Sequence, residues 1–313
     1  MEKIEKEQTF LSIVIQVKNH QKFVKEFFID IDNLLKNRFK TYEYIIVNNN
    51  SKDDTMKTIE NISEKIKGSI NVVNLPWDHN IENSMKAGID LAIGDFVFEF
   101  DRPIKDFENE LMINMYLKCL EGYDIVAAVP DSKIKFSSKL FYRILNKVSY
   151  RNMELITENF RIVSRRAINR TMSKKGSFKY RKALYHYSGF DTKIIRYKKT
   201  KDYSVDDLNI IDKIEFVSNV LVYYSNLGTK VCGLISLIFL LLSISGFFYA
   251  VFSYIFHDNL VSGWTTIMLF LSGSFTGLFI VLMFISKYLE SILTEIKNNT
   301  SYTYKSVDKF QKK

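Results

Sequence analysis

The segment YEYIIVNNNSKDDT, residues 42–55, runs from a short apolar stretch through a polar loop to the start of a helix. A nearly continuous apolar run such as Tyr42–Val47 is typical of a strand buried on both faces of a parallel sheet. Helical spacing begins at Thr55 and extends to Lys67, and the acidic side chains just before Thr55 can cap that helix. The segment therefore predicts a strand–loop–helix unit.

The same unit recurs on both sides of this segment. Further strands are predicted at Phe10–Val17, Ile70–Leu75 and Phe96–Phe100, and further helices at Gln21–Asn37 and Glu82–Ala92. Strands that alternate with helices predict a doubly wound α/β domain with a mainly parallel sheet. Ligands of such sheets bind at the carboxyl ends of the strands, where this chain has four polar loops, 18–21, 48–55, 78–83 and 101–106. A nucleotide site is expected at that edge.

Two hydrophobic stretches follow in the last third of the chain, Val231–Phe256 and Trp264–Ser286, and neither contains a charged residue. Each has the roughly 20 apolar residues that a helix needs to cross a bilayer. The intervening residues, 257–263, allow only a tight hairpin, so both flanks of the hairpin are expected on one side of the membrane. Lysines flank the two stretches and are absent between them, which predicts a cytoplasmic location for the large domain.

Basic residues concentrate between residues 133 and 201 of a chain whose formal net charge is +9. Beside a membrane anchor, lipid phosphates or anionic headgroups are the expected partners of these cations. A basic face that is merely solvated is the alternative. Nucleic acid is not expected as a partner, because no interleaved aromatic stacking motif accompanies the charge. The two cysteines, Cys119 and Cys232, do not have metal-binding spacing.

Several segments, in order, resemble those of family 2 glycosyltransferases with the GT-A fold. Within that family the chain is similar to bacterial polyisoprenyl-phosphate glycosyltransferases and to dolichol-phosphate mannose synthase. The resemblance covers about Phe10 to Tyr304 and is carried by SIVIQVKN (12–19), YEYIIVNNNSKDDT (42–55), DHNIENSMKAGIDLAIGD (78–95), FEFDRPIKD (98–106), GYDIVAAV (122–129), ENFRIVSRRAI (158–168) and KYLESILTEIKNNTSYTY (287–304).

This resemblance implies an inverting hexosyltransferase that moves a sugar from a nucleotide diphosphate sugar to a polyisoprenyl phosphate for cell-surface glycan synthesis. It implies a GT-A domain (1–201), juxtamembrane amphipathic helices (202–230), two transmembrane helices (231–256 and 264–286) and a cytoplasmic tail (287–313). The expected location is the bacterial inner membrane, with both termini cytoplasmic. A homo-oligomer is expected, with a tetramer as the state that the resemblance implies.

The donor site is assigned by the same resemblance. Asp101, at the end of the fourth strand, takes the position of the first aspartate of the family's metal motif, with Glu99 or Asp106 as further candidate ligands of Mg²⁺ or Mn²⁺. A helix N-cap is the alternative role for Asp101. The candidate nucleotide-sugar ligands are Gln16, Asn19, Asn48, Asn49, Ser51, Asp53 and Arg102.

The acceptor site is expected in the segment that approaches the membrane. Arg161, in Asn159-Phe160-Arg161, is the candidate ligand of the acceptor phosphate and, with Asp101, the candidate catalytic residue. A guanidinium can bind a phosphate through two parallel hydrogen bonds, which suits this role. The alternative role for Arg161 is a surface ion pair. Lys139 and Arg143 lie where related enzymes carry basic residues that face the lipid phosphate. Arg165 and Arg166 are expected to cover a helix face.

Several departures from the family pattern lie in the donor site. Asn48 and Asn49 replace the usual aspartate pair, and Pro103 replaces the second metal aspartate. Glu99 and Asp106 could complete the metal site, or Arg102 and Lys105 could supply positive charge in place of a metal. The remaining alternative is a catalytically inactive scaffold or binding subunit that keeps the fold and the membrane anchor.

Overall fold

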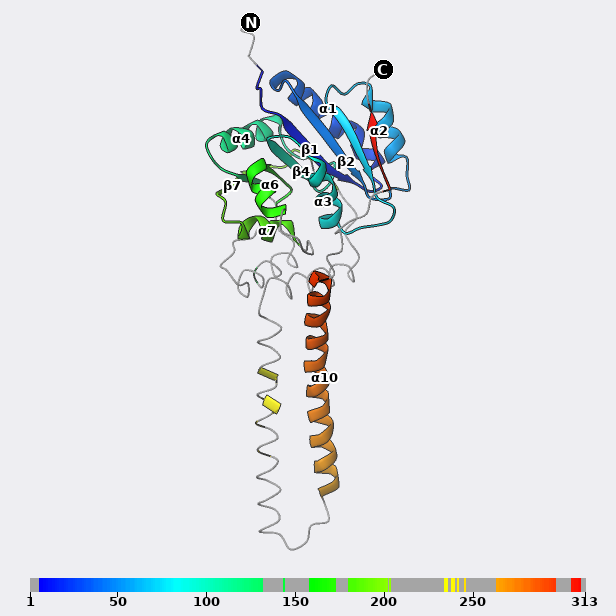
Figure 1. Cartoon of the computed structure of the whole chain (residues 1–313), viewed down its shortest axis with the longest axis vertical. Helices are drawn as coiled ribbons and strands as arrows, with labels where there is room; N and C mark the ends of the chain where they lie inside the picture. Colours follow the sequence, from blue (N-terminus) through cyan, green and yellow to red (C-terminus); the bar gives the residue numbers. More distant parts are fainter. Residues whose placement is uncertain are drawn as a thin grey trace. The chain divides into compact units, whose positions relative to one another are not determined.

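The computed structural model describes residues 6–131, 143, 158–172, 180–201, 203, 263–296 and 305–310, together with scattered residues between 234 and 245. The chain forms two compact units (Figure 1). The first comprises residues 1–143, 153–209 and 298–313, and the second comprises 144–152 and 210–297. The predicted phosphate ligand Lys139, nearly all of the predicted amphipathic segment and most of the first predicted span lie outside the described residues.

The first unit is built on an eight-stranded sheet with the order β7-β5-β6-β4-β1-β2-β3-β8. Strands β1 to β4 are mutually parallel, as predicted, while β6 runs antiparallel to both β4 and β5. The strands are β1 Leu11–Val17, β2 Tyr42–Asn48, β3 Ser69–Asn74, β4 Phe96–Phe100, β5 Ile125–Pro130, β6 Phe160–Ser164, β7 Thr192–Tyr197 and β8 Ser306–Phe310.

The helices of this unit follow the predicted alternation. They are α1 Gln21–Arg38, α2 Thr55–Ser63, α3 Ile81–Leu91, α4 Asn109–Leu120, α6 Arg165–Met172 and α7 Arg181–Tyr187. Helix α2 ends at Ser63 rather than at Lys67, because the hydrogen bonds that follow have the tighter i→i−3 pattern. The backbone nitrogen of Lys65 donates to the carbonyl of Ile62, and that of Ile66 donates to the carbonyl of Ser63. All seven residues of β1 are buried, and its alternate side chains enter the two core clusters on opposite sheet faces.

A close backbone approach holds β4 beside β1. A Cβ atom on Gly94, just before β4, would lie 2.6 Å from the backbone nitrogen of Ser12 and 2.8 Å from the carbonyl oxygen of Phe10. Only glycine fits there without moving the main chain. From there the parallel pairing of β4 with β1 carries the chain to Asp101, just beyond the opposite end of the strand.

The last described strand, β8, was not predicted. It pairs antiparallel with β3 and brings residues that follow the predicted hairpin back to the sheet of the first unit. The amide nitrogen of Asn74 donates to Asp308 Oδ2 (2.6 Å) and to Ser306 Oγ (3.0 Å), and Asn74 Oδ1 accepts from Asn48 Nδ2 (2.9 Å). Asn48 Oδ1 in turn accepts from the backbone of Ser51 at 3.0 Å. Strand β8 thus supports the loop that follows β2.

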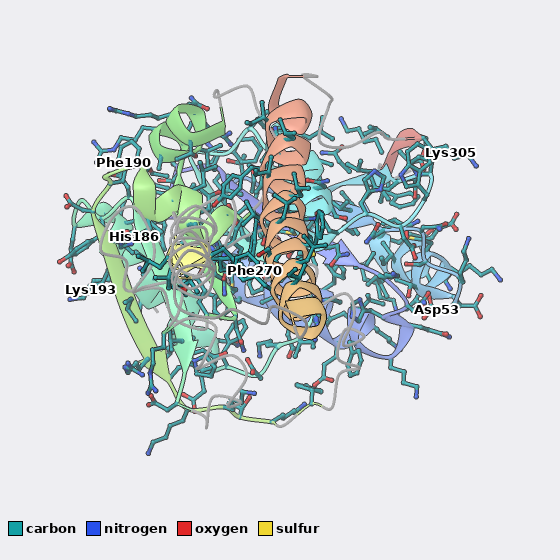
Figure 2. All side chains as sticks on the ribbon, turned by 90° about the horizontal axis from the view of Figure 1, so that it is seen from below. Asp53, His186, Phe190, Lys193, Phe270 and Lys305 are labelled. Carbon is teal, nitrogen blue, oxygen red and sulfur yellow. The ribbon has the colours of Figure 1, made fainter. Side chains whose placement is uncertain are left out.

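In the second unit the structure describes α10, Gly263–Ile296, a continuous helix of 34 residues that contains the second predicted span. Figure 2 looks along this helix and labels Phe270 on it. Its described apolar side chains are largely exposed, among them Ile267, Leu271, Phe275, Leu278, Met283, Leu289 and Ile292. Within the described part of the chain, which omits most of 231–262, no helix was found to be long and apolar enough to span a membrane.

Two glycines of α10, Gly273 and Gly277, have different surroundings. A Cβ atom on Gly277 would overlap the ring of Phe239, whereas a Cβ atom on Gly273 would meet nothing within 4 Å. Gly277 therefore allows the close approach of another segment of its own unit.

We expect Gly277→Ile to lower the melting temperature of the detergent-solubilised protein, because the new side chain must displace Phe239, at a cost of about 1–3 kcal/mol. Gly273→Ile is the matched control and should leave the melting temperature unchanged. Equal melting temperatures for both variants would show that the packing at Gly277 is unimportant.

Candidate functional site

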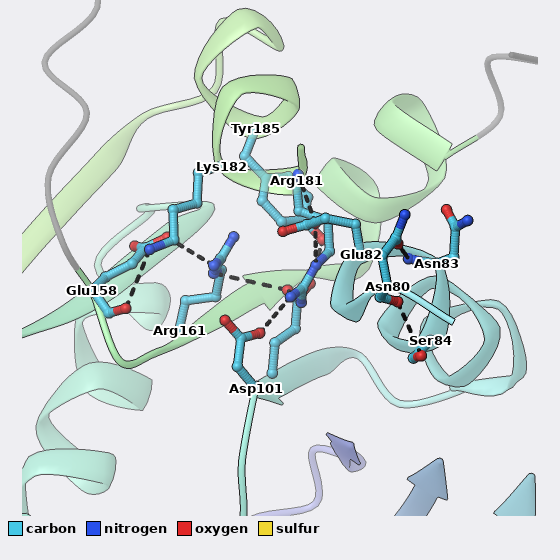
Figure 3. A network of polar contacts seen from close by, with 11 residues as sticks. Asn80, Glu82, Asn83, Ser84, Asp101, Glu158, Arg161, Arg181, Lys182 and Tyr185 are labelled. Atoms are coloured by element: carbon cyan, nitrogen blue, oxygen red, sulfur yellow. Dashed lines mark hydrogen bonds and ion pairs between the residues drawn. The ribbon is translucent and has the colours of Figure 1, made fainter. Parts of the chain in front are cut away.

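A buried ionic cluster lies at the carboxyl end of β4 (Figure 3). Its centre is the guanidinium of Arg181, which is fully buried. Its Nε donates to Glu82 Oε2 at 2.9 Å, one terminal nitrogen donates to Glu99 Oε2 at 2.7 Å, and the other donates to Asp101 Oδ1. One arginine therefore holds three carboxylates from two different elements, α3 and the end of β4.

The local backbone explains this arrangement. Glu99 and Asp101 are two residues apart at the end of an extended strand, so their side chains lie on the same side. Arg181 is the first residue of α7, and its backbone nitrogen also donates to Glu82 Oε2 at 2.9 Å. Tyr185, one turn later, donates its hydroxyl to Glu99 Oε1. Helix α7 thus supplies two donors to the acids of β4 and α3.

Arg161 belongs to the same cluster. The β4–β6 register pairs Glu99 with Arg161, whose Nε lies 3.8 Å from Glu99 Oε2 and whose Nη2 lies 2.8 Å from Glu158 Oε1. The side chain of Arg161 is 3% exposed, and its guanidinium carbon lies 5.6 Å from the centre of the Tyr185 ring. Among the described residues, Nε and Nη1 of Arg161 have no hydrogen-bond partner.

The pKa values follow from this charge distribution. Burial alone would raise the pKa of Asp101, but Arg181 and Arg161 hold it below its ordinary value. Burial raises the pKa of Glu99, and the same two arginines only partly oppose that rise. Burial would lower the pKa of Arg161, yet Glu158 and Glu99 raise it. Asp101 and both arginines are therefore charged at neutral pH.

The loops after β1 and β2 bring most of the predicted donor residues together. Asn19 Oδ1 accepts from the backbone of Lys52 at 2.8 Å, and the backbone nitrogen of Asn19 donates to Ser51 Oγ at 3.3 Å. Asp53 accepts from the backbone of Gln21 and from the backbone and hydroxyl of Thr55, the first residue of α2. These contacts hold the two loops side by side, as predicted.

The side chains that replace the family's aspartate pair make structural hydrogen bonds. Buried Asn49 donates to the carbonyl of His79 and accepts from its backbone nitrogen, both at 2.8 Å. Asn48 bridges Asn74 and Ser51, as described above. Gln16 is 6% exposed at the end of β1. Their assignment as nucleotide ligands stays a prediction.

Arg102 lies near the first loop. Burial lowers the pKa of His20 to about 4, and the positive charge of Arg102 contributes to that shift. Arg102 is half-buried and has no ion-pair partner among the described residues. Lys105, the other predicted cation, instead pairs with Asp30 at 3.2 Å.

Asp106, a candidate metal ligand, is bound elsewhere. It accepts from the hydroxyl of Tyr197 at 2.8 Å and from the amide of Asn159 at 3.0 Å, and Lys199 lies 3.6 Å away. No group of three His, Cys, Asp or Glu side chains that could hold a metal ion occurs within the described ranges. Metal ligation by Asp101, Glu99 or Asp106 stays a prediction.

The other predicted arginines have distinct places. Arg165 donates to the carbonyl of Gly94 at 2.9 and 2.7 Å, and Arg166 forms an ion pair with Asp124. Arg143 is exposed, and its neighbours lie outside the described residues. Sequence reasoning did not identify Arg181, Glu82 or Tyr185. The available signal was RKALYHY (181–187), a short segment with a cation one turn from an aromatic residue.

Comparison with known proteins gives consistent matches. The family model described as Glycosyl transferase family 2 matches residues 12–176. An uncharacterized glycosyltransferase of Synechocystis sp. is 28% identical over 302 residues, which cover 93% of each chain. The bactoprenol glucosyl transferase of Shigella phage SfV is 24% identical over 199 residues, which cover 61% of this chain and 64% of that protein.

Solved structures agree on the fold. The glucosyl-3-phosphoglycerate synthase of Mycobacterium tuberculosis, solved with Mn²⁺, UDP-glucose and phosphoglyceric acid, superposes with a TM-score of 0.50 at 12% identity. The match covers 68% of this chain and 78% of that one. The α/β domain therefore has the GT-A-like architecture predicted from the sequence.

Proposed function

The chain belongs to glycosyl transferase family 2 and is a transferase, and from this premise we propose that it moves a hexose from a nucleotide diphosphate sugar to a polyisoprenyl phosphate. Undecaprenyl phosphate is the proposed acceptor, for synthesis or modification of cell-surface glycans. The bactoprenol glucosyl transferases among the relatives support this acceptor, because bactoprenol is a polyisoprenyl alcohol. The alternative of an inactive scaffold gains no support from the comparisons.

The observation that carries the proposal is the pair of unpartnered nitrogens on Arg161. A buried donor without a hydrogen bond costs about 1–3 kcal/mol, so two such donors on one side chain support the proposal that a ligand with hydrogen-bond-accepting oxygens binds there. A phosphate supplies oxygens that match the guanidinium fork. Glu99 connects Arg161 to Asp101 through Arg181, which links the acceptor-side strand β6 to the predicted donor end of β4.

The reaction needs little proton transfer. An oxygen of the acceptor phosphate attacks the anomeric carbon, a new carbon–oxygen bond forms, and the nucleotide diphosphate leaves with the electrons of the old bond. The acceptor phosphate is largely ionised at neutral pH, because its second pKa is near 6. The protein must therefore orient the two phosphates and stabilise the negative charge of the leaving group.

A divalent ion, Mg²⁺ or Mn²⁺, was predicted to stabilise that charge. The candidate ligands do not fit such an ion well, because Glu99 and Asp101 already bind Arg181. Asp106 binds Tyr197 and Asn159, and residue 103 is proline.

Arg161→Lys should raise the KM for undecaprenyl phosphate by about tenfold or more while nucleotide affinity stays nearly unchanged. An ammonium cannot form the two parallel hydrogen bonds that a guanidinium makes to a phosphate. The measurement is a titration of undecaprenyl phosphate in a transfer assay, with calorimetric binding of the nucleotide in parallel. Arg165→Lys, on the arginine that binds the Gly94 carbonyl, is the control and should leave the acceptor KM unchanged. A loss of nucleotide affinity with an unchanged acceptor KM would show that Arg161 serves the donor.

We further propose that residues 231–286 form a membrane hairpin in the bacterial inner membrane, with the catalytic domain and both termini in the cytoplasm. The two charge-free stretches and the exposed apolar side chains of α10 support it. The pairing of β8 with β3 supports a common side for both flanks of the hairpin. A homo-oligomer, with a tetramer as the implied state, is part of the same proposal and is tested by the mass of the solubilised protein.

A reporter that is active only in the cytoplasm should be active when it is fused after Lys313. A second reporter fused within the predicted hairpin gap, after Asn259, should report the opposite side. The same side for both fusions would contradict the hairpin and leave the transferase assignment intact.

A further inference from the structure

We propose that the donor site works without a divalent ion, because Arg181 occupies the carboxylates that a metal would need and Arg102 supplies the charge that meets the donor diphosphate. This inference rests on the proposed function. It concerns how nucleotide diphosphate is bound and not whether it is bound.

Three of the four carboxylate oxygens of Glu99 and Asp101, at the end of β4, already accept hydrogen bonds. Both oxygens of Glu99 accept hydrogen bonds, Oε1 from Tyr185 and Oε2 from Arg181. Glu99 is 1% exposed, and Asp101 Oδ1 also accepts from Arg181. A metal ion that used these oxygens would have to displace a fully buried guanidinium and leave that cation without partners, which is strongly unfavourable.

The cluster combines acidic and basic side chains. Glu82, Glu99 and Asp101 surround Arg181, while Glu158 and Glu99 flank Arg161. The two arginines offset half of the formal negative charge of these four acids, and Lys182 adds a further positive charge that acts on Asp101. Hard cations such as Mg²⁺ are held by carboxylate oxygens, and Pro103 offers none where a second aspartate is expected.

Arg102 lies close to this cluster in the sequence. It directly follows Asp101 at the carboxyl end of the sheet, and its charge acts on His20 at the start of α1. The nearby cation Lys105 is paired with Asp30, whereas no described carboxylate pairs with Arg102. A half-buried arginine in this position has its hydrogen-bond donors available for a diphosphate.

The test is calorimetric binding of UDP and GDP to the full-length, detergent-solubilised protein, first with EDTA and then with excess Mn²⁺. We expect the affinity for the preferred nucleotide to differ by less than about threefold between the two conditions. With EDTA present, Arg102→Met should weaken diphosphate binding by about tenfold or more, the loss expected for one charge-assisted contact, and should change UMP or GMP binding less. Arg38→Met, at the far end of α1, is the matched control.

A wild-type affinity that rises tenfold or more with Mn²⁺ would overturn the inference and leave the transferase proposal standing. Unchanged diphosphate binding in Arg102→Met would also overturn it. Failure of both nucleotides to bind under either condition would instead overturn the proposed function and this inference with it.

A second variant tests the role of Arg181. Arg181→Met frees three carboxylates, so Mn²⁺ should raise the melting temperature of this variant and leave that of the wild type unchanged. The same rise in both proteins, or none in a folded variant, would contradict the role assigned to Arg181. If the variant does not fold, the comparison of wild type with EDTA and Mn²⁺ still decides the question.

Discussion

Asp101→Asn should lower the rate of sugar transfer by about a hundredfold or more while the protein stays folded. Asp101 lies at the mouth of the buried cluster, with 27% of its side chain exposed, and its carboxylate fixes one end of the Arg181 guanidinium. The amide keeps the shape of the side chain but loses the charge that orients the arginine. Misplacement of a donor or acceptor group by about 1 Å is enough for a loss of that size.

The measurement is transfer of labelled sugar to undecaprenyl phosphate, with the melting temperature as the test of folding. Asp95→Asn is the matched control, because Asp95 lies just before the opposite end of β4, where it accepts from the backbone of Phe10 at 2.9 Å. Transfer at the wild-type rate by Asp101→Asn would remove Asp101 from the mechanism.

The largest effect on stability is expected for Arg181→Met. Removal of one partner from a buried ion pair costs about 3–5 kcal/mol, and here three carboxylates lose their shared cation. Chemical denaturation at pH 8 should show this loss in the free energy of unfolding. Arg196→Met, which removes a weak exposed pair with Asp131 at 3.9 Å, should cost less than about 1 kcal/mol.

The loss should also depend on pH. Burial already raises the pKa of Glu99 above its ordinary value of 4.5, and removal of Arg181 raises it further. A group whose pKa is raised in the folded state stabilises the fold below its unfolded pKa and loses that contribution as pH rises through the folded pKa. The deficit of Arg181→Met should therefore be smaller near pH 5 than at pH 8. A deficit that grows toward pH 5 would contradict this account.

The parallel half of the sheet could be predicted from the sequence because its signals are local. The run at β1 is apolar throughout, and the polar loops follow each strand directly, so the bounds of β1 to β4 differ from the expected ones by at most one residue. Strand β8 could not be predicted in this way. Its sequence, SVDKF, has little apolar content, and its pairing with β3 depends on a contact more than 230 positions away.

The candidate site shows the same division. Asp101 and Arg161 could be named as candidates because the motifs around them are local, and the structure places both in one ionic cluster, while their roles stay predictions. Arg181 was missed because a lone arginine at the start of a seven-residue helix resembles any solvated cation. Its importance arises only when folding buries it among acids from α3 and β4.

The pairing of β8 with β3 also has a consequence for the order of events during synthesis. Residues 306–310 leave the ribosome after 231–286, so the edge of β3 stays unpaired until the predicted hairpin has been made. An unpaired edge is open to pairing with other chains. Asn74 acquires its bonds to Ser306 and Asp308 only then, and Asn48 is linked to them through its own bond to Asn74. The hydrogen bonds that support the loop after β2 are therefore completed only after residues 306–310 have been made.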